Sequence, residues 1–127
     1  MQEKHLFEYA TIRFVPRVER EEFLNVGVVL YCAKKKFLQC KFYLDSNKLK
    51  AFYCEEEMPE FEKHLSAFQQ ICVGLENSGP IGKLDIPSRF RWLTAMRSTV
   101  IQTSRVHPGF CDDPQKTLNK LFEELVL

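Results

Sequence analysis

Alternating hydrophobicity in the first third of the chain limits the fold more than any other feature of the sequence. In the first of three such segments Ala10, Ile12 and Phe14 share one side of an extended strand, and more polar side chains share the other. The segments are separated by short polar links, which join antiparallel neighbours and are too short for a parallel crossover. We therefore expect an antiparallel meander. The three strands are residues 7–16 (FEYATIRFVP), 25–32 (NVGVVLYC) and 37–44 (FLQCKFYL).

The second strand has two residues that are unusual for a buried strand, Asn25 and Gly27. On strict alternation Val26 faces the core, while Asn25 and Gly27 share the opposite face. Glycine within a strand marks a bulge or a close backbone approach, and asparagine at a strand entrance hydrogen-bonds a neighbouring loop. Two interpretations follow. The strand is bulged and Asn25 holds the preceding loop, or Gly27 lets another molecule pack closely beside Asn25, Arg13 and Glu22.

The later part of the chain has mainly the period of helices. A long helix is predicted to begin near Pro59, with apolar residues spaced by three and four. Ser88 is a candidate cap for a helix over RFRWLTAM, STVIQTS is a candidate fourth strand, and RVHPGFC is expected to be a loop. Asp113 followed by Pro114 predicts the start of an amphipathic last helix. We expect one α+β domain over residues 1–127, a mainly antiparallel four-stranded meander sheet with the long and C-terminal helices packed on one face.

Charge and cysteine usage indicate the class of protein. The net charge of +1 gives no overall field that would attract nucleic acid or an anionic membrane. The first residues lack the basic start and apolar run of a signal peptide, and the longest apolar run, Val26–Ala33, is too short to cross a bilayer. An odd number of cysteines at irregular spacing is typical of reduced thiols in a cytoplasmic protein, and we expect no cofactor and no metal. The cysteines are Cys32, Cys40, Cys54, Cys72 and Cys111.

Two blocks of sequence resemble a known family signature. The first is YATIRFVPRVEREEFLNVGVVLY and the second is LTAMRSTVIQTSRVHPGFCDDPQKTLNKLFEELV. Together they are similar to the Domain of Unknown Function 3037 family. The resemblance implies a small, stand-alone bacterial protein whose relatives are often encoded beside a HipA-like kinase, and hence a protein partner. In the family's commonest pattern Gly-Glu precedes the phenylalanine of the first block, whereas this chain has Glu21 and Glu22, which makes the loop less permissive.

The best candidate site combines the two blocks. Arg97 can bind a phosphate or carboxylate through two parallel hydrogen bonds, and neighbouring hydroxyl and amide groups can donate further hydrogen bonds to the same anion. The alternative is structural, with Arg97 at a helix end paired to Glu22 within the fold. The predicted recognition surface consists of Arg13, Glu22, Asn25, Arg97, Ser98 and Gln102.

Other polar clusters have simpler explanations. The acid-free stretch from Ile86 to Cys111 interleaves arginines with aromatic residues, as single-stranded nucleic acid requires, but nucleic acid is only weakly indicated. Asp113 is explained as a helix cap, so its proximity to Asp112 and His107 does not indicate a metal site. The lysines of AKKK are expected to be a solvated hairpin tip.

The sequence thus favours a non-catalytic binding module with a protein partner. The alternative is a small enzyme or nucleic-acid binder that acts on a phosphate-bearing ligand at the same surface. No catalytic residue is identified, and the sequence leaves open whether a reaction is catalysed.

Overall fold

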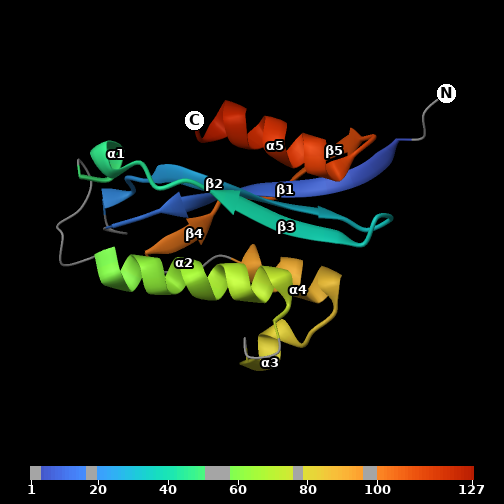
Figure 1. Cartoon of the computed structure of the whole chain (residues 1–127), viewed down its shortest axis with the longest axis horizontal. Helices are drawn as coiled ribbons and strands as arrows, with labels where there is room; N and C mark the ends of the chain where they lie inside the picture. Colours follow the sequence, from blue (N-terminus) through green and yellow to red (C-terminus); the bar gives the residue numbers. More distant parts are fainter. Residues whose placement is uncertain (1–3, 17–19, 51–57, 76–78, 96–99) are drawn as a thin grey trace.

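The structure is a computed structural model that describes residues 4–16, 20–50, 58–75, 79–95 and 100–127 (Figure 1). Its centre is an antiparallel sheet of five strands. The strands are β1 (His5–Phe14), β2 (Leu24–Cys32), β3 (Phe37–Phe42), β4 (Ile101–Thr103) and β5 (His107–Cys111).

The first strand in sequence is the central strand in space. β2 pairs along one edge of β1 and carries β3 on its far side, which confirms the predicted meander. The other edge of β1 is shared by β4, which pairs with its C-terminal end, and β5, which pairs with its N-terminal half. The α+β class is therefore confirmed, with β5 added to the four predicted strands.

Five helices complete the described chain. They are α1 (Ser46–Lys50), α2 (Met58–Val73), α3 (Gly79–Gly82), α4 (Ile86–Leu93) and α5 (Pro114–Leu125). The cap of α5 is Asp113, as predicted, because its carboxylate accepts a hydrogen bond from the Gln115 amide. The cap of α4 is Asp85 and not Ser88, whose own amide donates to the Asp85 carboxylate.

The helices cover both faces of the sheet, so the prediction that the long and C-terminal helices pack on one face is wrong. Figure 1 shows α2 and α4 on one side of the sheet and α5 on the other. The reason lies in β2, where residues facing both sides are buried. The core on the α2 side includes Ala10, Ile12, Phe14, Val29, Phe61 and Phe90, and the core on the α5 side includes Phe7, Val28, Leu30, Leu118 and Phe122.

A β-bulge lies at Asn25 and Gly27, the two residues that are unusual for a buried strand. Ile12 is opposite Gly27 and Arg13 is opposite Asn25, so Val26 is an extra residue in β2. Strict alternation therefore fails here. Val26 joins the core on the α2 side, and Asn25 turns to the α5 side, where its Nδ2 donates to the Leu125 carbonyl at 3.4 Å. The bulged-strand interpretation is confirmed, although the partner of Asn25 is α5 and not the preceding loop.

Gly27 makes room for the neighbouring strand. A Cβ atom at this position would lie 2.6 Å from the Lys41 carbonyl oxygen and 2.8 Å from the Phe42 Cβ. The space that the glycine leaves is therefore filled by β3 and by no ligand.

The segment RVHPGFC contains β5, so the prediction of a loop there is wrong. Pro108 and Gly109 lie within this strand, opposite Glu8 and Phe7 of β1. The Phe7 ring occupies the space above Gly109, since a Cβ there would lie 2.5 Å from the ring. Within the part of the chain described here, no helix combines the length and apolar character needed to span a membrane.

Candidate functional site

A row of polar side chains crosses the sheet at the bulge. Arg13 on β1 lies opposite Asn25 on β2 and opposite Gln102 on β4. Directly opposite residues of antiparallel strands project to the same face. The row therefore lies on the α5 side, beyond the end of that helix, as the contact of Asn25 with the Leu125 carbonyl indicates.

The loop before β2 turns this row into a shallow pocket of about 280 Å³, which we call the Arg13 pocket. Of the predicted surface, Arg13, Glu22 and Gln102 line it and Asn25 lies beside it. Arg97 and Ser98 lie outside the described residues. The pocket lining consists of Arg13, Val15, Glu21, Glu22, Phe23 and Gln102.

Arg13 has an unusual environment for a strand arginine. Its guanidinium carbon lies 4.0 Å from the centroid of the Phe23 ring, a cation–π contact. Its Nε atom is buried without a hydrogen-bond partner among the described residues. Burial lowers the pKa of Arg13, because removing water disfavours the charged form. Glu21 and Glu22 line the same pocket, but Glu22 pairs with Arg20 at 3.2 Å, and no carboxylate of the described residues forms an ion pair with Arg13.

This arrangement is suited to holding an anionic group. A guanidinium presents planar donors that match a carboxylate or phosphate, and Phe23, which is 44% exposed, adds an apolar surface beside them. Arginine does not exchange its proton at ordinary pH, so it cannot act as a general base. The described lining contains no cysteine, serine, threonine or histidine that could act as a nucleophile.

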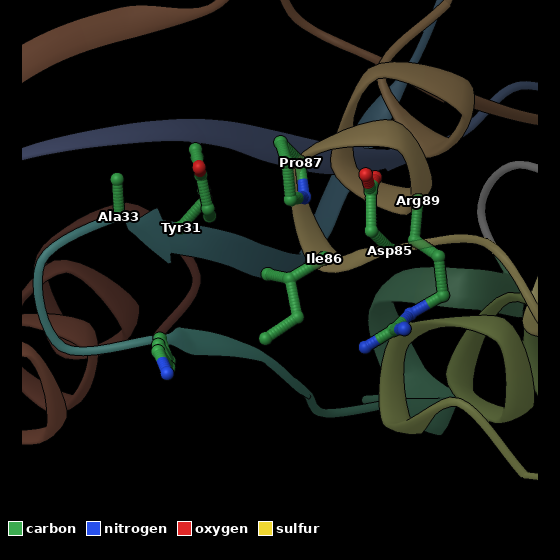
Figure 2. A pocket seen from close by; sticks show the side chains of 7 residues that line it. Tyr31, Ala33, Asp85, Ile86, Pro87 and Arg89 are labelled. Carbon is green, nitrogen blue, oxygen red and sulfur yellow. The ribbon is translucent and has the colours of Figure 1, made fainter.

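A second pocket lies at the opposite end of the sheet and on its other face. It has a volume of about 350 Å³ and lies between the β2–β3 hairpin and the first turn of α4 (Figure 2). We call it the hairpin pocket. Its lining consists of Tyr31, Ala33, Lys36, Asp85, Ile86, Pro87 and Arg89.

Residues 9–126 match the family model described as "Protein of unknown function (DUF3037)". The chain belongs to this family. No curated protein and no solved structure matches the chain. The DUF3037 match extends from β1 to the end of α5, so both pockets lie within the family domain.

The rim of the Arg13 pocket contains a left-handed turn. Glu21, which lines the pocket, has a backbone φ of 55°. A side chain clashes with the backbone in the left-handed region, which raises the energy of every residue except glycine. The loop that carries Glu22 and Phe23 therefore depends on a strained turn in this chain.

We expect Glu21→Gly to stabilise the protein by about 1 kcal/mol, because it removes the strain of a left-handed side chain. The measurement is the free energy of unfolding from urea melts. Glu22→Gly is the matched control, since that backbone is not left-handed and glycine there only adds freedom to the unfolded chain. Equal effects of the two substitutions would contradict the strained turn.

The arginine and aromatic residues of the acid-free stretch do not form one surface. Phe90 is fully buried and cannot stack on a base. Arg91 pairs with Glu8 at 3.5 Å, and Arg89 Nη1 donates to the Leu84 carbonyl at 2.7 Å. These contacts give both arginines a role within the fold.

His107 and Cys111, two further candidate groups, make contacts within the fold. The His107 ring lies 5.3 Å from the Tyr9 ring, and Cys111 is buried beside Cys32. Burial raises the pKa of the Cys111 thiol, which makes it a poor nucleophile. No group of three or more histidine, cysteine, aspartate or glutamate side chains in the described residues could hold a metal ion.

Proposed function

We propose that the chain is a cytoplasmic bacterial binding module without catalytic activity, and that the Arg13 pocket is its recognition surface. The proposal rests mainly on Arg13, which lies at the centre of a polar row without an ion-pair partner in the described chain. A half-buried cation without an acidic partner is costly to maintain. A partner that supplies a carboxylate or phosphate would offset that cost.

The chemistry of the pocket favours recognition over catalysis. Arg13 can bind an oxyanion in a fixed orientation, with the amide groups of Asn25 and Gln102 beside it. Phe23 offers an apolar contact next to this polar row. A charged anchor beside an exposed aromatic side chain is typical of energetically important residues at protein interfaces. The HipA-like kinase that the family resemblance suggests is the first partner to test.

The decisive experiment compares Arg13 variants of the full chain. Partners are first captured from the native host and identified by mass spectrometry, and their affinities are then measured by calorimetry. We expect Arg13→Ala to weaken binding at least about tenfold and Arg13→Lys to recover only part of it, because lysine keeps the charge but not the planar fork. Stability should fall by about 1 kcal/mol, which corresponds to the lost contact with Phe23.

Arg105→Ala is the matched control, since Arg105 is an exposed arginine outside the pocket. It should leave partner binding unchanged. If Arg13→Ala and Arg105→Ala both bind as tightly as the original chain, the Arg13 pocket is not the recognition surface.

The alternative is a small enzyme or nucleic-acid binder that acts on a phosphate-bearing ligand at the same place. It is favoured by the suitability of an arginine fork for phosphate as well as carboxylate. Titration with inorganic phosphate, a nucleoside triphosphate and single-stranded oligonucleotides separates the two. Arg13-dependent binding of any of these, with turnover or with a steep dependence on salt, would favour the alternative.

A further inference from the structure

We propose that the hairpin pocket is a second docking site, which binds an acidic peptide segment through one aromatic or branched aliphatic side chain. Its lining includes residues of α4, whereas the polar row of the Arg13 pocket lies on the face that α5 covers. Figure 1 shows α4 and α5 on opposite sides of the sheet. The inference therefore does not rest on the proposed function of Arg13, and either can fail without the other.

The shape of the pocket is set by side chains that are themselves held in place. The Tyr31 ring stacks at 5.2 Å on the fully buried Phe90 and forms an apolar floor. Figure 2 shows Ile86 reaching from the first turn of α4 toward the hairpin, with Ala33 on the hairpin side. A volume of about 350 Å³ is near the lower end of the roughly 300–1,000 Å³ found for ligand pockets, so it suits a side-chain anchor.

Two exposed apolar side chains lie on the same face of the sheet as the pocket. Glu8 lies opposite Tyr31, and Leu6, two residues earlier, projects to the same face. Leu6 lies opposite Phe110 of β5, and these side chains are 53% and 71% exposed. Neighbouring exposed apolar side chains mark an interaction surface better than isolated ones.

The charges around this surface favour an acidic partner. Lys36 and Arg89 line the pocket, and the exposed Lys35 lies beside Lys36 in the hairpin. Two carboxylates lie nearby. Glu8 pairs with Arg91, and Asp85, which lines the pocket, accepts the Ser88 amide at 2.9 Å as the cap of α4. The two basic side chains of the lining outnumber its one carboxylate, and this excess of positive charge complements glutamate and aspartate residues that flank the anchor.

A peptide fits these observations better than nucleic acid does. The floor ring, Tyr31, packs on Phe90 within a concave pocket, and Phe90 is buried beneath it. Single-stranded nucleic acid requires a series of exposed rings along a basic groove. One apolar cavity with a basic rim instead recognises one anchor side chain in an acidic sequence.

The test uses fluorescence anisotropy with the full chain and a set of labelled peptides. Each peptide carries one central phenylalanine, tryptophan, leucine or isoleucine between glutamates. Matched peptides carry serine at the centre, or lysines in place of the glutamates. Folding of each variant is checked by thermal melts followed by circular dichroism.

We expect at least one acidic peptide with an apolar anchor to bind, and the serine and lysine peptides to bind at least tenfold more weakly. Lys36→Glu should weaken binding about tenfold through charge repulsion, and Ala33→Phe should do so by filling the pocket without changing the charge. Lys48→Glu, an equal charge change on α1 at the other end of the sheet, should have no effect (Figure 1).

Three outcomes would overturn the proposal. The first is that no acidic peptide binds at concentrations up to about 1 mM, the limit of weak recognition. The second is that Lys36→Glu and Lys48→Glu weaken binding equally, which would indicate unspecific charge attraction. The third is that a single-stranded oligonucleotide binds more tightly than every peptide and is unaffected by Ala33→Phe.

Discussion

Replacing Gly27 with alanine is expected to destabilise the protein by about 2–3 kcal/mol, because a side chain there overlaps the neighbouring strand. The new Cβ atom would lie 2.6 Å from the backbone oxygen of Lys41 and 2.8 Å from the Phe42 Cβ. Neither atom is the end of a flexible side chain, so relief requires β3 to move away from β2. The measurement is the free energy of unfolding from urea melts.

Gly79→Ala is the control for this prediction. Gly79 has a left-handed backbone with φ of 82°, but no atom of the described residues lies within 4 Å of the place that a Cβ would take. Its substitution therefore introduces backbone strain without a clash, and we expect it to cost about 1 kcal/mol. A Gly27→Ala protein as stable as Gly79→Ala would show that β3 is not packed against β2 as described.

Removal of a buried ring should have the largest effect of all. Phe61 of α2 is fully buried, and its ring centroid lies 4.2 Å from that of Phe14 in the central strand. Truncation of a buried phenylalanine to alanine typically costs about 3–5 kcal/mol through lost burial and a residual cavity. Since single domains are stable by only about 5–15 kcal/mol, Phe61→Ala should be close to unfolded at 37 °C.

Phe110→Ala provides the same chemical change at an exposed position. With 71% of its surface exposed, Phe110 should contribute less than about 0.5 kcal/mol to stability. Thermal melts of the two variants therefore test the packing of α2 on the sheet. If Phe61→Ala melts at the same temperature as Phe110→Ala, that helix does not cover the sheet face as the structure has it.

Sequence patterns predicted the strands and helix ends that are determined by residues close to one another in the chain. β1, β2 and β3 follow from alternation and short links, and the start of α5 follows from Asp113 and Pro114. β5 was missed because Pro108 and Gly109 disfavour a strand when read along the chain alone. Its pairing with β1 and the Phe7 ring over Gly109 depend on residues about a hundred positions away.

The candidate site was predictable as a set of residue types but not as an arrangement. Arg13, Asn25 and Gln102 come into one row only because Val26 is extra in β2, which changes the register at this point. Phe23 was not singled out, since its contact with Arg13 depends on the turn at Glu21. The hairpin pocket could not be predicted at all, because it joins the lysine-rich tip to a helix far along the sequence.

The central position of β1 has a consequence for synthesis on the ribosome. β2 follows β1 directly and can pair with it as soon as both strands have emerged. The other edge of β1 stays unpaired until β4 and β5 have been translated, near the end of synthesis. Until then the nascent chain presents unpaired backbone donors and acceptors along its first strand, a template for intermolecular pairing. Translation speed and chaperone occupancy over this interval should therefore influence the yield of folded protein.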